Sequence, residues 1–88
     1  MQGLDDRMIF SGLEEASRAF EALGIPKGHL DAYIEAGEFQ LAYDEAMTIV
    51  IEQKRSGGEK FGPVLAQTEV FLKDLRLHFG DDYAGFYK

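Results

Sequence analysis

Apolar residues recur every three or four positions along most of this chain, which is the spacing of an amphipathic helix. The first such stretch ends at Gly24 and has acids at Asp5 and Asp6, which favour a helix N-terminus. Ser11, with Glu14 three residues later, is a second possible start, because that pair can cap a helix. The apolar positions of this stretch are Ile9, Leu13, Ala16, Phe20 and Leu23. The pattern predicts one helix whose first residue is left open between these two starts.

The central stretch, residues 30–52, predicts two helices that follow each other at a single glycine. The first is short and ends at Gly37, where glycine can adopt a left-handed conformation at little cost. Pro26 suits the first turn of that helix, because proline needs no backbone donor there. The second helix is expected over residues 38–54. The apolar positions are Leu30, Tyr33 and Ile34 in the first helix, and Phe39, Ala42, Tyr43, Ala46, Ile49 and Val50 in the second.

A loop and one further helix complete the pattern. Residues 56–59, SGGE, predict a flexible connection, and helical spacing resumes at Phe61 and stops at Gly80. The apolar face of this last helix contains Leu65, Thr68, Leu72, Leu75 and Phe79. Because the connections are short and neither strand alternation nor a long repeat is present, we expect an all-α fold. The expected architecture is a compact bundle of about four helices with short connections, in a single domain over residues 1–88.

The last residues, DDYAGFYK, do not continue the helical pattern but include Tyr83, Phe86 and Tyr87. Such side chains either fold back over the bundle or form an aromatic anchor at an interface, where tyrosine is enriched. The sequence leaves both readings open.

Charge is distributed unevenly along the chain. Residues 1–52 contain eleven acids and three bases, whereas residues 53–88 contain five acids and six bases. A negative field repels phosphate backbones and attracts cationic proteins, so we expect no direct binding of nucleic acid. The alternative is that these acids form a solvated surface that keeps a small protein in solution.

Composition also favours a cytoplasmic location. The chain contains no cysteine, which fits a reducing compartment and excludes disulfides and thiolate metal sites. No apolar run approaches the length of a membrane span, and the acidic start MQGLDDRMIF does not resemble a secretion signal. We therefore expect neither export nor contact with a membrane.

Candidate catalytic and metal-binding groups are sparse. Asp74 and His78 could meet on one helix, but two ligands make a weak site, and His29 reads as an exposed turn residue. None of the three serines has a nucleophile motif, and SGG lacks the strand and Lys-Ser/Thr pair of a phosphate-binding loop. The adjacent pairs Glu14-Glu15 and Asp44-Glu45 point in different directions on a helix and cannot share one proton. We expect no enzyme activity, no metal and no cofactor.

The segment IEAGEFQLAYDEAMTIVIE resembles the core of the MafI-type and related small helical immunity proteins of bacterial contact-dependent growth inhibition (CDI) systems. In that family a helix ends in Gly-Glu-aromatic and the next helix carries an aliphatic-Ala-aromatic-acid run. The matching residues here are Gly37, Glu38 and Phe39, followed by Leu41, Ala42, Tyr43 and Asp44. The resemblance covers residues 30–52 well, and the rest of the chain only in length, helix order and charge.

The resemblance implies a cytosolic protein that binds the C-terminal toxin domain of an effector and covers its active site. Many such toxins are nucleases, possible tRNA nucleases among them, and they are basic because they bind phosphates. We read the Gly37-Glu38-Phe39 motif as structural, since its residues suit a helix end, a helix start and a core position.

The leading hypothesis is therefore an immunity protein that forms a 1:1 heterodimer with a basic toxin domain through an acidic face. The predicted toxin-binding residues are Asp31, Glu35, Asp44, Glu45, Glu52, Glu14, Glu15 and Tyr83. The alternative is a non-catalytic homo-oligomeric or adaptor module that uses the aromatic tail and the SGGE loop. Met47 and Ile51 support this alternative, because they lie outside the main apolar face of their helix and are expected to be exposed.

Overall fold

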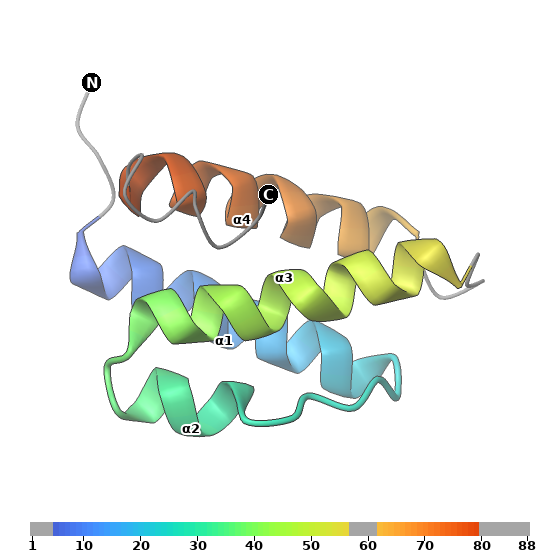
Figure 1. The fold of residues 1–88 in the computed structure, drawn as a ribbon, viewed down its shortest axis with the longest axis horizontal. Helices are drawn as coiled ribbons and strands as arrows, with labels where there is room; N and C mark the ends of the chain where they lie inside the picture. Colours follow the sequence, from blue (N-terminus) through green and yellow to red (C-terminus); the bar gives the residue numbers. More distant parts are fainter. Residues whose placement is uncertain (1–4, 57–61, 80–88) are drawn as a thin grey trace.

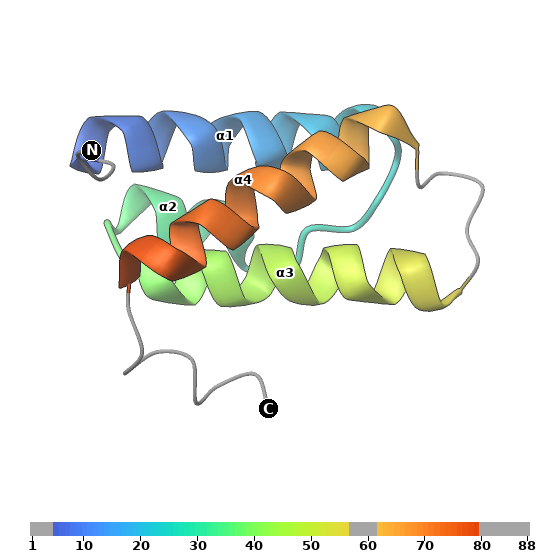
Figure 2. The same cartoon turned by 90° about the horizontal axis from the view of Figure 1, so that it is seen from above.

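A computed structural model describes residues 5–56 and 62–79, which form four α-helices in three layers (Figure 1). α1 and α3 lie side by side in the middle layer, α4 crosses them obliquely on one side, and α2 covers the other side (Figures 1 and 2). α1 and α3 each pack against all of the other helices, and consecutive helices run in opposite directions. The helices are α1 (Asp6–Ala22), α2 (Leu30–Glu35), α3 (Phe39–Arg55) and α4 (Pro63–Phe79). The all-α prediction is confirmed.

The first helix begins at the acids and not at Ser11. Asp5 is the N-cap of α1, and its side-chain oxygen accepts a hydrogen bond of 2.9 Å from the backbone N–H of Met8. This bond satisfies one of the donors that a helix start leaves unpaired. Gly12, which weakens helix propensity, is nevertheless inside α1, and the reason lies in tertiary packing. A Cβ at Gly12 would lie 2.3 Å from the ring of Phe71 on α4, so glycine allows this ring to pack on the helix backbone.

Two of the three predicted helix ends at glycine lie within the described residues, and both are present with the same hydrogen-bond pattern, whereas Gly80 lies outside the described residues. After α2, Gly37 has a φ of 76°, and its N–H donates to the carbonyl of Ile34 at 3.1 Å. The N–H of Glu38 donates to the carbonyl of Tyr33 at 2.9 Å, which completes a Schellman motif. Gly24 ends α1 in the same way, with a φ of 71°. The Glu38 side chain makes no capping bond, and Phe39 lies partly buried against the core.

The prediction that Pro26 lies in the first turn of α2 is wrong. Pro26 is exposed in the connection between α1 and α2, and α2 begins only at Leu30. Ile25 explains the difference, because this residue is 5% exposed and anchors the connection in the core directly after the Schellman turn of α1. Gly28, with a φ of 58°, then redirects the chain just before α2.

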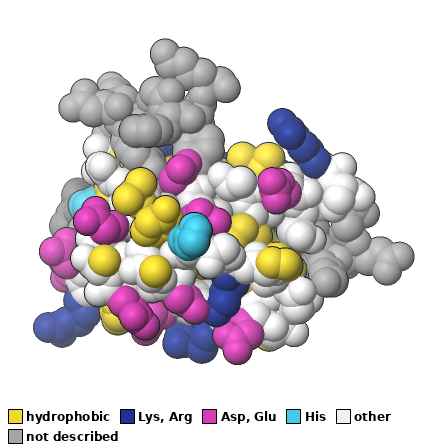
Figure 3. All heavy atoms as spheres, turned by 60° about the horizontal axis from the view of Figure 1, so that its bottom comes forward, with side chains coloured by type: hydrophobic (Ala, Val, Ile, Leu, Met, Phe, Trp, Pro, Cys, Tyr) yellow, Lys and Arg dark blue, Asp and Glu magenta, His cyan; other side chains and the backbone are white. Residues whose placement is uncertain are grey.

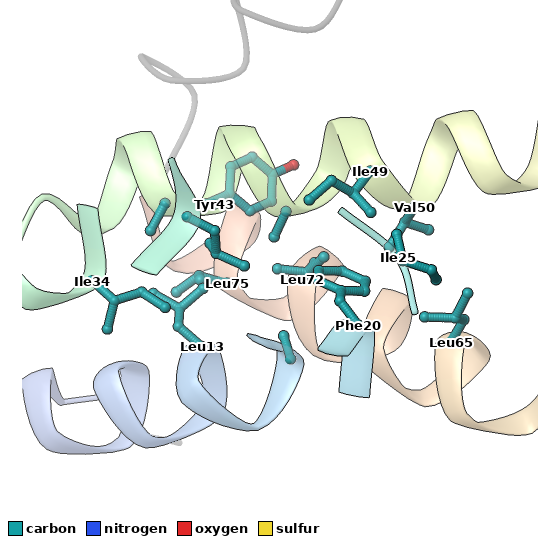
Figure 4. Packing of buried hydrophobic residues seen from close by; sticks show 14 of the residues in the cluster. Leu13, Phe20, Ile25, Ile34, Tyr43, Ile49, Val50, Leu65, Leu72 and Leu75 are labelled. Carbon is teal, nitrogen blue, oxygen red and sulfur yellow. The ribbon is translucent and has the colours of Figure 1, made fainter. Parts of the chain in front are cut away.

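The core lies between the middle layer and the two outer layers and receives side chains from every helix (Figure 4). Tyr43 is 1% exposed, and its ring meets that of Phe79 edge to face at a centroid distance of 5.9 Å. Burial raises the pKa of the Tyr43 hydroxyl. The expectation that Met47 and Ile51 are exposed is wrong, because both are half-buried and Met47 packs against the core. The largest fully buried side chains are Tyr43, Phe20, Ile9, Leu13, Leu30, Leu65, Leu72, Leu75 and Val50.

Candidate protein-binding surface

The structure divides the predicted acidic residues into those that are paired within the chain and those that are not. In the part of the chain that the structure describes, five of the predicted carboxylates make no ion pair and no hydrogen bond: Glu14, Glu15, Glu35, Glu45 and Glu52. Asp31 is held by a lysine, and Asp44 has an interaction within the chain. Tyr83 lies outside the described residues. The unpaired carboxylates are therefore the part of the predicted set that is available to a partner.

Glu14 and Glu35 come together at a shallow pocket of about 220 Å³ between α1 and α2. Glu35 is exposed and Glu14 is half-buried, and Asp31 lines the same pocket. Ile34 forms apolar lining, while Arg18 and Lys27 supply positive charge at this pocket. Glu14 of α1 thus shares one side of the molecule with Asp31 and Glu35, which lie one turn apart on α2, because α2 packs on α1.

Lys27 is the centre of the polar network beside this pocket. Its Nζ donates hydrogen bonds to Asp31 at 2.8 Å, to Glu21 at 3.0 Å and to the hydroxyl of Ser17 at 3.0 Å. Ser17 in turn donates to Asp31 at 2.5 Å. The hydrogen bonds to Asp31 and then to Glu21 raise the pKa of Lys27, and the bond from Lys27 lowers the pKa of Asp31. The network ties the connection before α2 to α1, so Asp31 has a structural partner.

A serine hydrogen-bonded to a lysine and a carboxylate resembles a nucleophile with a base, but this network lacks the base. A raised pKa keeps Lys27 protonated at neutral pH, so its ammonium cannot accept the proton of Ser17. Asp31 has a lowered pKa and is correspondingly a weak proton acceptor. Ser17 is also only 6% exposed, which limits access of any substrate. The network fits a role in folding better than a role in catalysis.

Two further predicted acids, Glu45 and Glu52, lie on α3. Glu45 is half-buried, and its carboxylate lies against the backbone of Gly28 in the connection that leads into α2. Glu52 follows Glu45 by seven residues, so it lies on the same side of α3 two turns further along, where it is exposed. α2 and the connection before it thus have Glu14 and Glu35 at the pocket toward α1 and Glu45 at the connection toward α3. We call this surface the α2 face and define it by Glu14, Glu35, Glu45, Glu52, His29 and Tyr33.

The aromatic pair on the α2 face was not predicted as a site. His29 is exposed at the N-cap of α2, and its ring lies 6.2 Å from that of Tyr33, with the planes tilted by 58°. Sequence reasoning treated the first residue as a turn and the second as core, although their spacing of four residues indicates that they meet. Figure 3 shows that acidic side chains on this side of the molecule are interspersed with hydrophobic ones. Tyrosine surrounded by charge is a common arrangement in binding surfaces.

Glu15 lies apart from the α2 face. It lines a groove between α1 and α4 together with Gly12, Val64 and Phe71. The structure therefore does not bring Glu15 together with the other unpaired acids.

No group of three or more His, Cys, Asp or Glu side chains that could hold a metal ion occurs within residues 5–56 and 62–79. Over the same residues, none of the helices is long and apolar enough to cross a membrane. Comparison of the chain with models of known protein families, with curated proteins and with solved structures finds no match.

Proposed function

We propose that this chain is an immunity protein that binds a cationic toxin domain through the α2 face and covers its active site. The observation that carries the proposal is the set of carboxylates on the first three helices that have no cation within the described chain. Glu35 lies on α2, and Glu14 and Glu45 lie beside α2 or the connection that leads into it. Glu52 continues the row of Glu45 along α3, and all four are in the half of the sequence that carries eleven acids and three bases. The sequence resemblance to CDI immunity proteins supplies the class of partner.

The charge of this surface suits a partner that binds nucleic acid. A nuclease must present Lys and Arg to the phosphates of its substrate, and an acidic protein can occupy that surface in place of the polyanion. Carboxylates without an internal partner can accept charge-assisted hydrogen bonds from Arg, often in pairs. Long-range attraction between the two proteins also accelerates their encounter.

The α2 face further offers contact area that is not charged. Tyr33 is half-buried, so its ring is held in place by the core while its outer part is accessible. A side chain that is already ordered loses little conformational entropy when a partner packs on it. Tyr33 and His29 are therefore the proposed central contacts, and Glu35 and Glu52 are proposed to pair with cations at the edge of the interface.

The test is co-expression of the chain with the toxic C-terminal domain encoded beside it in the genome. Survival of the host cells, together with a stable 1:1 complex on copurification, supports the proposal. Tyr33→Ala should then weaken protection, whereas Val64→Ala should not, because Val64 is an exposed apolar residue at the groove between α1 and α4, outside the α2 face. Undiminished killing with a folded chain and no complex would contradict the proposal.

A further inference from the structure

Glu45 carries a half-buried carboxylate that makes no ion pair and no hydrogen bond within the described residues. The carboxylate lies against the backbone of Gly28, and a Cβ at Gly28 would overlap its oxygen Oε2. Glycine, which also permits the φ of 58° at this position, is therefore what allows the carboxylate to lie there. Lys27, the residue before Gly28, is already bound to Asp31. A charge that is partly removed from water and has no partner interacts strongly with a cation that reaches it.

Two rings and an exposed leucine lie next to this carboxylate. His29 follows Gly28 directly, and its ring lies 6.2 Å from that of Tyr33. Leu41 is 44% exposed and precedes Glu45 by one turn of α3. Because α2 and α3 run in opposite directions, Glu45 lies toward His29 and Leu41 lies toward Tyr33 (Figure 1). We call this strip the α2–α3 seam and define it by His29, Tyr33, Leu41 and Glu45.

We propose that the α2–α3 seam binds an arginine side chain of the toxin domain. The guanidinium pairs with Glu45 and packs against the rings of His29 and Tyr33, while the methylene groups contact Leu41. The inference rests on the proposed function, because it names the group by which the α2 face recognises its partner. Arginine fits better than lysine, since its planar head can pair with a carboxylate through two hydrogen bonds and can also stack on aromatic rings.

The other unpaired acids of the α2 face suit different roles. Glu35 and Glu52 are exposed, so they are suited to attracting a cationic partner from a distance. Glu14 is half-buried, but Arg18 and Lys27 line the same pocket, and their charges oppose the entry of another cation. The α2–α3 seam is therefore the part of the face where a bound cation is held most firmly.

Titration of the full chain with N-acetyl-arginine amide, followed by ¹⁵N–¹H NMR, tests the site without the toxin. We expect shifts of the backbone signals of Gly28, His29 and Tyr33, with an affinity about two- to fivefold higher than for N-acetyl-lysine amide. Glu45→Gln should remove these shifts. Glu15→Gln is the matched control and should keep them, because it makes the same change of charge at an exposed acid outside the α2 face.

Three results of this titration would overturn the proposal: no shifts at these residues, equal affinities for the two probes, or shifts that survive Glu45→Gln. Thermal unfolding of both variants verifies that they remain folded.

The dissociation rate of the toxin complex tests the same site in a binding partner. Glu45→Gln should accelerate dissociation about tenfold or more, because it leaves the arginine without its charged partner, and should change the association rate much less. Glu15→Gln should leave dissociation near that of the parent chain. Dissociation that Glu45→Gln leaves unchanged would overturn the arginine site but not the proposed function. A chain that prefers the arginine probe yet does not bind the toxin domain would support the site and contradict the proposed function.

Discussion

Replacement of Gly12 by alanine provides a quantitative test of how α1 and α4 pack. In an exposed helix this change stabilises a protein by about 1 kcal/mol, because alanine has the higher helix propensity. Here the new methyl carbon would lie 2.3, 2.4 and 2.9 Å from three ring atoms of Phe71. Carbon atoms in contact are normally separated by about 3.5 to 4.0 Å, so the ring must move by about 1 Å or more.

The gain in helix propensity raises the free energy of unfolding and the steric conflict with Phe71 lowers it. The steric conflict is expected to have the larger effect. Overpacking of this kind costs about 1 to 3 kcal/mol. Subtraction of the gain in helix propensity leaves a net loss of about 1 kcal/mol for Gly12→Ala. Removal of the ring by Phe71→Ala eliminates the steric cost, so in that background the same substitution should stabilise the protein by about 1 kcal/mol. The predicted coupling between the two positions is about 2 kcal/mol.

Urea unfolding of the four proteins in this double-mutant cycle, followed by circular dichroism, measures the coupling. Ser11→Ala is the control, because Ser11 is exposed in the same turn of α1 and should show only a small gain from helix propensity. A Gly12→Ala protein that is more stable than the parent by the same amount in both backgrounds would refute the close contact between this glycine and the ring.

Two further predictions concern local features of the fold. Gly37→Ala should lower the free energy of unfolding by about 1 kcal/mol, because alanine is strained at the φ of 76° that this residue adopts. No atom lies within 4 Å of the added methyl group, so the loss should come from the backbone alone. Urea unfolding measures it, and an unchanged stability would argue against the left-handed turn. Glu69 accepts a hydrogen bond from Lys54 that lowers its pKa from 4.5, so its contribution to stability is complete above pH 4.5 and is lost as the pH falls through the lower folded-state value. Glu69→Gln should therefore make the loss of thermal stability below pH 4.5 less steep, and an identical pH profile would contradict this role for the ion pair.

The fold could be predicted from sequence where local chemistry decides it. The four helices follow from the spacing of apolar residues, and the ends at Gly24 and Gly37 follow from the conformational freedom of glycine. Pro26 was misplaced because a proline is acceptable both in the first turn of a helix and in the connection before it. Only the burial of Ile25, which is a tertiary contact, decides between the two.

The acidic character of the candidate surface could be predicted from the sequence, but the positions and internal partners of its acids could not. That acids dominate residues 1–52 is evident from the sequence. Which acids are already paired depends on contacts between distant segments, and the bonds from Lys27 to Ser17 and Asp31 exist only because α1 and α2 pack together. Glu15 follows Glu14 directly, yet the helix turns it toward α4 and away from the α2 face.

The central claim, that the α2 face binds a cationic toxin, is tested most directly by the association rate of the purified chain with the toxin domain. Glu35→Lys and Glu52→Lys reverse exposed charges on this face, and Glu15→Lys makes the same change of net charge outside it. The account predicts that each of the first two variants associates about three- to tenfold more slowly at low salt and depends less on salt, while the third is much less affected. Equal rates for the three variants would contradict binding through the α2 face.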